Sequence, residues 1–361
     1  MSKSRILSIQ SHVAFGYVGG KAAVFPLQCL GYDVDVVNTV NFSNHSGYAR
    51  FGGSRTSASE LSTIFQTMEE NGLLEPERLL TGYIPGGEAL SSVKDLATRL
   101  RHKNSQMIYL LDPVLGDSGK LYVAPDVIPI YRSMLPLSTI ITPNWFEVEV
   151  LTDIRITDLL SLRKALRILH EEHHVPNVVV SSIPLRAWMY ESLPSHIQHP
   201  LDADNPQPDD GYLLCISSST EDPDRGGYPS TVHARSIPLI PGYFSGVGDL
   251  FSALLLAHYQ PTSEYLVSES VNANGHPLPI AASEALSKTH AMLALTQEYS
   301  MSLPEDERLP TDEEIDEQEP SRKIRRMKGR ELRLIQGQDI IRGTRPIEHR
   351  KMELWTGFWS S

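Results

Sequence analysis

The sequence predicts an α/β fold of three layers, in which helices cover both faces of a central, mostly parallel sheet. Short runs rich in Val, Ile and Leu alternate with longer amphipathic runs from the start of the chain. Strands of a parallel sheet are buried on both faces and carry nearly continuous apolar residues, whereas the helices that cover them are amphipathic. The length of 361 residues is sufficient for a large core of this kind.

The expected elements follow one another in order along the chain. Strands are expected over residues 5–11, 32–40, 78–84, 107–113, 137–144 and 177–183. Helices are expected over residues 20–31, 57–72 and 88–102, from residue 145 onward, and over 158–173 and 250–258. Ligands of such sheets bind beyond the carboxyl ends of the strands, so the residues directly after each strand are the candidates for function.

Two segments interrupt this alternation. Residues 191–234 are rich in Pro, Asp, Ser and Gly around one strand-like run, 211–219, and are expected to form an elaborated hairpin with long loops. Residues 302–330 pass from an acidic block to a basic block, which is the composition of a solvated, disordered insertion. The expected organisation is one domain over 1–300, an insertion over 302–330, and a final strand near 331–336 followed by a tail within 331–361.

Composition excludes several classes of protein. Hydrophobic residues make up 40% of the chain and charged residues 21%, and no apolar run approaches the roughly 20 residues that span a membrane. The first residues lack the apolar core of a signal peptide. Two cysteines, Cys29 and Cys215, cannot form a disulfide framework or a structural zinc site. We therefore expect a cytoplasmic protein without a membrane partner.

The net charge of −12 is concentrated in one segment. Residues 305–319 contain nine acidic residues and one arginine, so the remainder of the chain carries only −4. Nothing in the sequence forms the broad basic face that nucleic acid binding requires. The basic residues 322–330 leave a nuclear import signal open as an alternative.

Two motifs resemble known signatures but fail on inspection. GYVGGK at 16–21 has only three residues between Gly16 and Gly20, and Ala22 stands where a phosphate-binding loop needs a hydroxyl. HEEHH at 170–174 satisfies the zinc protease pattern, but no third ligand is evident and histidines also suit a helix end. We expect the first motif to be a strand-to-helix turn near a ligand and the second to be structural.

Two carboxylates follow the strand expected over 107–113. Asp112 and Asp117 frame the run DPVLGD, and magnesium prefers a few carboxylates together with phosphate oxygens. A turn built from Asp-Pro and Gly-Asp explains the same residues equally well. The motif alone leaves both alternatives open.

Thr142, Asn144 and Glu147 lie at the end of the next expected strand. Asn144 and Glu147 have the spacing of a capping box, in which Asn144 begins a helix. The alternative is that both side chains face magnesium and phosphate from the strand end. Taken alone, the spacing favours the cap.

The residues after the first two strands suit a small ligand. The runs SIQSHVAFGYVGG and NFSNHSGYARFGG both concentrate hydroxyl, amide, histidine and aromatic side chains. That composition fits a small polar aromatic molecule better than it fits a packed core.

Asp249 follows Gly246 and Gly248 where an apolar helix begins. A structural explanation is a tight glycine turn with a carboxylate at the positive end of a helix dipole. A chemical explanation is that bare N–H groups bind an anion and the carboxylate beside them takes a proton. Together with the polar strand ends, the chemical explanation predicts phosphoryl transfer, with Asp249 as base and Gly246 to Gly248 as anion hole.

In this order, the motifs resemble the pyridoxal kinases of the ribokinase-like superfamily, of the fungal type with a longer C-terminal region. Residues 8–48 are close to the family's N-terminal signature, and LTGY, DPVLGD, ITPNWFE and GVGDLFSALLL follow at the expected places. The resemblance covers residues 1–190 and 235–300 well and 331–336 more loosely. It implies a three-layer α/β/α ribokinase-like (Rossmann-like) fold over 1–300. It also implies ATP-dependent phosphorylation of the 5′-hydroxyl of pyridoxal, pyridoxine and pyridoxamine, a reaction of vitamin B6 salvage.

The resemblance implies a role for each residue around the vitamin. Ser11 would hydrogen-bond the pyridine ring, and Val18, His45 and Tyr83 would form the walls around it. Ser46 would contact a ring substituent, and it stands where the family often has threonine.

The resemblance also implies the nucleotide, cation and catalytic residues. The implied ATP-binding residues are Asp117, Tyr122, Asn144, Ser181, Ser182, Gly246, Val247 and Gly248. The implied ligands of Mg²⁺ (or another divalent cation such as Zn²⁺) and of K⁺ or Na⁺ are Asp112, Asp117, Thr142 and Glu147. The implied catalytic residues are Asp249, which takes the proton of the 5′-hydroxyl, with Gly246 and Gly248. The family further implies a homodimer with one complete site per subunit.

One residue departs from the family pattern, and two other functions remain as alternatives. Val247 stands where many members carry threonine, which removes a side-chain donor to the phosphates but leaves the backbone N–H groups. The alternatives are a hydroxymethylpyrimidine-type kinase of the same fold and a non-catalytic vitamin B6-binding protein. SNHSGY argues against the first, and the intact Asp249, Asp112 and Glu147 argue against the second.

Overall fold

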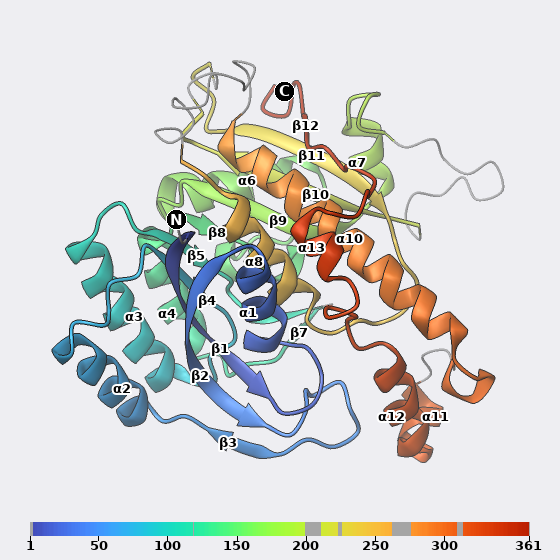
Figure 1. Cartoon of the computed structure of the whole chain (residues 1–361). Helices are drawn as coiled ribbons and strands as arrows, with labels where there is room; N and C mark the ends of the chain where they lie inside the picture. The colour runs from blue at the N-terminus through green and yellow to red at the C-terminus, as the bar shows by residue number, and fades with distance from the viewer. Residues whose placement is uncertain are drawn as a thin grey trace.

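The computed structural model describes residues 3–117, 119–198, 211–222, 226–261, 276–308 and 313–360. Within these residues, ten strands form one sheet in the order β12-β11-β10-β9-β8-β5-β4-β1-β2-β3 (Figure 1). The strands are β1 (Lys3–Val13), β2 (Tyr32–Phe42), β3 (Gly53–Arg55), β4 (Arg78–Thr81), β5 (Ile108–Leu111), β8 (Ile140–Ile141), β9 (Asn177–Pro184), β10 (Tyr212–Ser219), β11 (Thr231–Pro238) and β12 (Glu353–Leu354). The six strands from β9 to β2 are parallel, and β3, β10, β11 and β12 are antiparallel to their neighbours.

Helices cover both faces of the sheet, which confirms the expected three-layer α/β/α fold. One face packs against α1 (Gly20–Cys29), α8 (Val247–His258), α10 (Pro277–Ser302) and α13 (Gln338–Arg342). The other face packs against α2 (Ala58–Glu70), α3 (Gly87–Lys103), α4 (Val127–Met134), α5 (Trp145–Thr152), α6 (Leu159–Arg167) and α7 (Ala187–Ser192). Successive strand residues alternate between the two cores, as Leu79 and Leu80 do in β4. No helix in the described part of the chain is long and apolar enough to cross a membrane.

The register of the parallel strands brings their carboxyl ends to one edge of the sheet. Ile9 of β1 lies opposite Val37 of β2 and Thr81 of β4. Leu111 of β5 lies opposite Thr81 and Ile141. The loops that follow β1, β2, β4, β5 and β8 therefore leave the sheet side by side, and these loops carry the candidate residues.

The C-terminal region differs from what its sequence suggests. Residues 331–336 form turns and not the expected final strand, and the last strand of the described residues is β12, which pairs with β11. Leu332 and Leu334 are buried in the core beneath α1, α8 and α10. The alternating apolar pattern of this run therefore reflects packing against helices and not strand pairing.

The expectation of a disordered insertion over 302–330 is wrong for the part that the structure describes. That part forms a 3₁₀ turn (Glu305–Glu307) and helices α11 (Glu313–Gln318) and α12 (Pro320–Gly329). The buried Asp316 carboxylate accepts hydrogen bonds from Arg322 (2.7 Å) and Arg326 (2.9 Å). The acidic and basic blocks thus pair with each other, which composition alone does not reveal. Residues 309–312 lie outside the described residues.

The segment 191–234 forms the hairpin that its sequence suggests. The run 211–219 contributes β10, which lies antiparallel between β9 and β11. Residues 199–210 and 223–225 lie outside the described residues.

His170 of the HEEHH run is a buried link between a helix and a strand. It lies in a short π-helix (Ile168–Glu172) that extends α6. Its Nδ1 is 2.7 Å from the Val175 carbonyl oxygen, and its Nε2 is 2.8 Å from Ser218 Oγ in β10. Burial lowers the pKa of His170 to about 4, so the ring is neutral at physiological pH.

Candidate active site

Helix α8 begins in a turn that requires glycine. Gly246 precedes the helix with φ of +79°, and a Cβ at this position would lie 2.0 Å from the Tyr17 carbonyl oxygen. The segment that follows β1 therefore passes directly over the turn. Asp249 lies in the first turn of α8, and its Oδ2 accepts a hydrogen bond of 2.7 Å from the Gly19 N–H. The turn thus positions Asp249, the expected base, against the loop after β1, which is expected to bind a ligand.

Two carboxylates repel each other near this turn. Burial raises the pKa of Asp249, and the Gly19 hydrogen bond opposes this shift. Burial also raises the pKa of Asp112 to about 8, and the negative charge of Asp249 contributes to that shift. A carboxylate with a raised pKa binds a proton more tightly, which is what a general base needs. The repulsion between the two side chains is relieved by a proton or by a cation.

Ser252 joins two of the expected cation ligands, and our sequence analysis did not identify it. Its hydroxyl donates to Asp112 Oδ2 at 3.1 Å and lies 2.8 Å from Thr142 Oγ1. Ser252 is buried and lies one helical turn after Asp249. That spacing, which places both side chains on the same face of α8, is the signal that could have revealed it.

The capping box at the start of α5 is present, and Glu147 also supports a second loop. Asn144 Oδ1 accepts from the Glu147 N–H and Glu147 Oε2 accepts from the Asn144 N–H, both at 2.9 Å. Glu147 Oε1 accepts from the N–H groups of Leu115 (2.9 Å) and Gly116 (3.4 Å). Asn144 Nδ2 donates to the Gly116 carbonyl oxygen at 2.8 Å. Asn144 and Glu147 therefore hold the DPVLGD loop in place.

Glu147 is buried, and its charge is disfavoured. Burial raises its pKa well above the ordinary value, the charge of Asp112 adds to this, and the backbone hydrogen bonds from Asn144, Leu115 and Gly116 oppose it. Asp112 and Glu147 are therefore close enough for the charge of one to affect the other. A cation near Asp112 would therefore also stabilise the charged form of Glu147.

A short hairpin extends from DPVLGD into solvent. Its strands are β6 (Gly116–Asp117) and β7 (Lys120–Leu121), and the next residue, Tyr122, is 54% exposed. The Tyr122 N–H donates to the Leu115 carbonyl oxygen at 2.8 Å. The aromatic ring expected to cover the nucleotide is thus accessible on a small protruding element.

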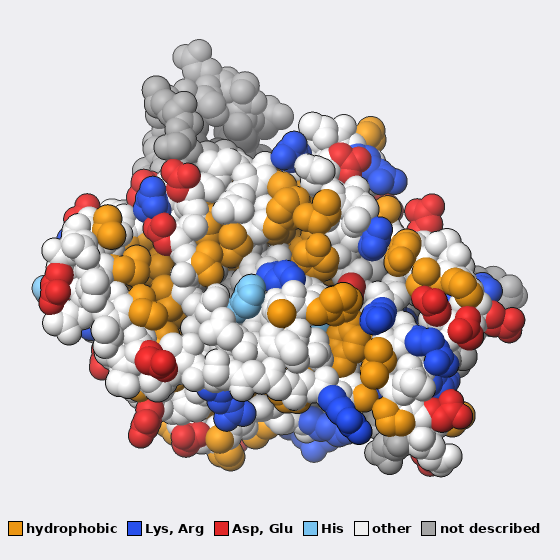
Figure 2. Space-filling model, turned by 60° about the horizontal axis from the view of Figure 1, so that its bottom comes forward, with side chains coloured by type: hydrophobic (Ala, Val, Ile, Leu, Met, Phe, Trp, Pro, Cys, Tyr) orange, Lys and Arg blue, Asp and Glu red, His pale blue; other side chains and the backbone are white. Residues whose placement is uncertain are grey.

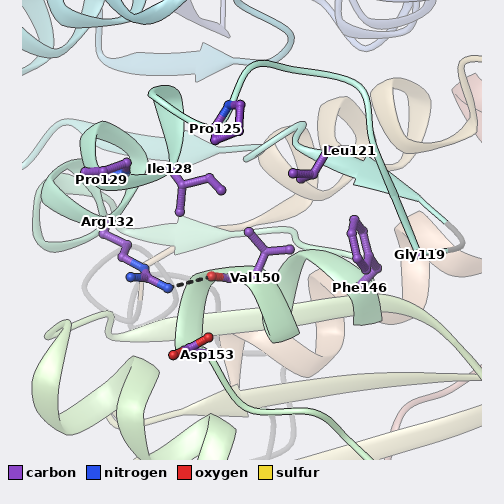
Figure 3. Close-up of a pocket in the computed structure, with 9 residues that line it drawn as sticks. All are labelled: Gly119, Leu121, Pro125, Ile128, Pro129, Arg132, Phe146, Val150 and Asp153. Carbon is purple, nitrogen blue, oxygen red and sulfur yellow. Dashed lines mark hydrogen bonds between the residues drawn. The ribbon is translucent and has the colours of Figure 1, made fainter.

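An apolar cleft of about 600 Å³ lies beside this hairpin (Figure 3). Its lining residues are Gly119, Leu121, Pro125, Ile128, Pro129, Arg132, Phe146, Val150 and Asp153. The Arg132 guanidinium donates to the Val150 carbonyl oxygen at 2.7 Å. None of the expected site residues lines this cleft, so it is a separate feature of the surface.

Of the expected vitamin-binding residues, Ser11 lies near the carboxyl end of β1, and the others lie on the segments that follow β1, β2 and β4. Ser11 and His45 are buried, Val18 and Tyr83 are half-buried, and Ser46 is exposed. Ser11 Oγ lies so close to Gly19 that a Cβ there would be 2.2 Å away. His45 Nδ1 accepts from the Gly47 N–H at 3.1 Å and lies 3.3 Å from Ser245 Oγ. These contacts join the loops after β1 and β2 to the turn before α8.

The expected nucleotide residues from β9 lie beside the segment between β8 and α5. Ser181 and Ser182 are half-buried near the carboxyl end of β9. The Ser181 N–H donates to the Pro143 carbonyl oxygen at 3.2 Å. Val247 is the first residue of α8, so its N–H belongs to the unpaired donors at the helix start.

Figure 2 brings the bottom of Figure 1 forward, where the ends of β1 and β2 and strand β3 lie. Hydrophobic side chains are spread across the middle of this view, and many acidic side chains lie toward its margins. The aromatic side chains that the candidate loops expose to solvent are Phe15, Phe51, Tyr122 and Tyr243.

Sequence analysis also missed Glu331, whose carboxylate contacts both N-terminal loops. It lies 3.0 Å from His45 Nε2 and 2.8 Å from the Tyr17 nitrogen. Glu331 belongs to the run that was expected to form a final strand, so no local pattern pointed to a role in the site.

The chain is similar to pyridoxal kinases over most of its length. It is 40% identical to the pyridoxal kinase of Arabidopsis thaliana over 253 residues, which cover 70% of this chain and 73% of the relative. It is 38% identical to the pyridoxal kinase of Sus scrofa over 287 residues, which cover 77% and 82%. Among solved structures, the pyridoxal kinase of Leishmania donovani in complex with ADP and pyridoxamine matches with a TM-score of 0.73 at 27% identity, over 98% of this chain and 99% of that chain.

A family model described as phosphomethylpyrimidine kinase matches residues 75–190. This range contains Asp112, Asp117 and Glu147 but not the loops after β1 and β2. The match therefore concerns the part of the site expected to hold cations and phosphates, and it leaves out the loops after β1 and β2, which are expected to hold the vitamin.

Proposed function

This chain belongs to the pyridoxal kinase family, and on that premise we propose that it transfers the γ-phosphoryl group of ATP to the 5′-hydroxyl of pyridoxal, pyridoxine and pyridoxamine. The observation that carries the proposal is the 2.7 Å hydrogen bond from the Gly19 N–H to Asp249. This bond joins the loop that would hold the vitamin to the carboxylate that would take its proton. The product from pyridoxal is pyridoxal 5′-phosphate.

Asp249 is the proposed general base. Its carboxylate takes the proton of the 5′-hydroxyl as that oxygen attacks the γ-phosphorus. The new P–O bond forms as the bond to the β–γ bridging oxygen breaks, and ADP leaves with that electron pair. The N–H groups of Gly246, Val247 and Gly248 hold phosphate oxygens at the start of α8, where a helix has unpaired donors. Val247 contributes no hydroxyl there.

The loops after β1, β2 and β4 form the proposed vitamin site. Ser11 bonds the pyridine ring, Val18, His45 and Tyr83 form its walls, and Ser46 contacts a ring substituent. Two observations support this assignment: Ser11 and His45 are buried polar residues, and Ser11 lies against Gly19 while His45 lies 3.3 Å from Ser245, just ahead of α8. A ring inserted between half-buried walls would be held away from water, which limits hydrolysis of ATP without transfer.

The segments at the carboxyl ends of β5, β8 and β9 would hold the nucleotide. We assign Asp117, Asn144, Ser181 and Ser182 to the phosphates and Tyr122 to the hairpin above the nucleotide. The relative from Leishmania donovani has been solved with ADP, which supports ATP as the phosphoryl donor. The exposed position of Tyr122 leaves its ring available to cover a bound nucleotide.

The residues around Asp112 fit cations. We propose that Asp112, Asp117, Thr142 and Glu147 serve Mg²⁺, or another divalent cation such as Zn²⁺, and a monovalent K⁺ or Na⁺. The fit is electrostatic, because burial raises the pKa of both carboxyl groups, and the charge of Asp249 adds to the shift of Asp112 as the charge of Asp112 adds to that of Glu147. The phosphate oxygens of ATP would complete the ligand set, as is usual for magnesium. When bound, the cations neutralise charge on the phosphates.

We also propose a cytoplasmic homodimer with a complete site in each subunit. A nuclear import signal at 322–330 is disfavoured, because Arg322 and Arg326 of this segment are bonded to the buried Asp316. Sedimentation of the purified protein tests the assembly. A monomer that retains full turnover would contradict it.

A substrate comparison distinguishes the proposal from the two alternatives. We expect MgATP-dependent phosphorylation of pyridoxal and little product from hydroxymethylpyrimidine. The reverse preference would assign the chain to the hydroxymethylpyrimidine kinases, which the family model over residues 75–190 also describes. Binding of pyridoxal without any product would favour a vitamin-binding protein.

A further inference from the structure

Glu331 connects the C-terminal segment to both N-terminal loops of the site. Its Oε2 accepts from the Tyr17 N–H at 2.8 Å. Its Oε1 accepts from the Tyr48 hydroxyl at 2.7 Å and lies 3.0 Å from His45 Nε2. Only 12% of the Glu331 side chain is exposed. One mostly shielded carboxylate therefore receives three hydrogen bonds from two loops that lie close to 300 residues earlier in the chain.

The loop after β1 is shaped to receive this carboxylate. Gly16 has φ of +93°, and a Cβ there would lie 2.6 Å from Glu331 Oε1 and 2.7 Å from Oε2. Glycine is required both for the backbone conformation and for the close approach of the carboxylate. The glycine that resembled part of a phosphate-binding loop thus has a different function, which is to admit Glu331.

The contacts of His45 define where its proton lies. The Gly47 N–H can only donate, and it points at His45 Nδ1 at 3.1 Å. Nδ1 is therefore the acceptor nitrogen, and Nε2 carries the hydrogen that is donated to Glu331. Ser245 Oγ lies 3.3 Å from the same Nδ1. Glu331, His45 and Ser245 form a continuous chain that ends beside the turn before α8.

Glu331 is ionised in this environment. Burial acts to raise the pKa of Glu331, but hydrogen bonds from His45, Tyr48 and the Tyr17 N–H outweigh it and hold the pKa below its ordinary value. An ionised carboxylate offers acceptor sites on both oxygens to these donors.

The segment that carries Glu331 is fixed by further contacts on both sides. Met327 of α12 lies against the loop after β2, where a Cβ on Gly47 would be 3.2 Å from its Cε. The Arg330 guanidinium lies against Gly242, ahead of α8, where a Cβ would be 3.1 Å away. The C-terminal segment thus contacts the loops after β1 and β2 and the approach to α8.

We propose that Glu331 is a positioning residue for the vitamin site: its carboxylate sets the His45 tautomer and joins the loops after β1 and β2 into one wall. The inference rests on the proposed function. Glu331 acts through His45 and the Tyr17 backbone and does not itself touch the vitamin. It is expected to affect the use of pyridoxal much more than the use of ATP.

Glu331→Gln tests this role, because glutamine keeps the shape but has only one acceptor oxygen. In either orientation of the amide, its NH₂ group faces at least one of the three donors. Loss of one hydrogen bond to a charged group, at about 1.5 kcal/mol, predicts that kcat/KM for pyridoxal falls about tenfold. The KM for ATP should change less than twofold. Glu348→Gln is the matched control, because the exposed Glu348 side chain pairs with Arg350, and it should alter neither constant.

Equal effects of Glu331→Gln on pyridoxal and ATP, or no effect on either, would overturn the proposal. If the variant fails to fold, Tyr48→Phe removes one of the three donors and should raise the KM for pyridoxal by a smaller factor. No change in that KM would contradict the proposed role of Glu331.

The imidazole ¹⁵N spectrum of His45 tests the same inference without substrate. We expect Nε2–H in the wild-type protein and a loss or mixture of that tautomer in Glu331→Gln. A wild-type ring protonated at Nδ1 would contradict the proposal. Since this measurement requires no turnover, it separates failure of the inference from failure of the proposed kinase activity.

Discussion

Gly246 shows how one residue sets the position of the proposed base. Its φ of +79° and the nearby Tyr17 carbonyl oxygen exclude any side chain. Gly248, two residues later, has open space where its Cβ would be. The two glycines of the same motif therefore differ: the turn requires glycine at position 246, whereas position 248 has room for a side chain.

We predict that Gly246→Ala destabilises the protein. A non-glycine residue with positive φ costs about 1–3 kcal/mol, and the clash with Tyr17 adds to that cost. Urea unfolding measures the change. Gly248→Ala is the matched control, because alanine in a first helical turn should leave the free energy of unfolding unchanged or raise it by up to about 1 kcal/mol. Equal stability of the two variants would contradict the account of the turn.

Helices α11 and α12 show how an element remote in sequence supports the site. The Asp316 carboxylate binds Arg322 and Arg326 of α12, and the chain continues from α12 into Glu331. The acidic and basic blocks, which composition suggests are solvated, are thereby part of the folded structure.

We predict that Asp316→Asn loosens this C-terminal element. Removing one member of a buried ion pair costs about 3 kcal/mol, because the buried Arg322 and Arg326 lose the carboxylate that they share. Limited proteolysis should cut within residues 313–331 faster than in the wild type, and the KM for pyridoxal should rise. Glu314→Gln, at an exposed position of α11, is the control. Unchanged proteolysis and KM would show that the pairs do not hold the element.

The link between the end of α6 and β10 predicts a dependence of stability on pH. Burial lowers the pKa of His170 to about 4, from about 6.5 in an unfolded chain. Below pH 6.5 His170 binds a proton in the unfolded chain but not in the folded protein. The free energy of unfolding therefore falls as the pH decreases toward 4. The expected loss is up to about 3 kcal/mol. His170→Gln should flatten this part of the curve, and an equally steep loss in the variant would exclude His170 as its source.

At the scale of the whole molecule, the sequence was sufficient for the sheet and its covering helices. Residues 107–113 and 88–102 carry strong local periodicity, and they form β5 and α3. The strand-end rule then located Asp112 and Glu147 at one edge, because parallel strands end together, and the glycine-flanked start of an apolar helix indicated Asp249. These predictions depend only on local pattern and on the geometry common to all such sheets.

The remaining features depend on contacts between distant segments. His45 and Glu331 are 286 residues apart, and neither carries a local signal of the other. Leu332 and Leu334 alternate as in a strand, yet both are buried against helices. Composition likewise does not predict the pairing of Asp316 with Arg326. Blocks of acidic and basic residues have the composition of a solvated segment, and only the fold shows that they bind each other.

The central claim is that Asp249 is the base of a phosphoryl transfer, and the most direct test is product formation from pyridoxal and MgATP by Asp249→Asn. Asparagine keeps the size of the side chain and an oxygen that can accept from the Gly19 N–H, but it cannot take a proton at neutral pH. We predict a fall in kcat of about 10²–10⁴-fold, the usual contribution of a general base, with thermal stability and pyridoxal binding retained. Full turnover in Asp249→Asn would contradict the account.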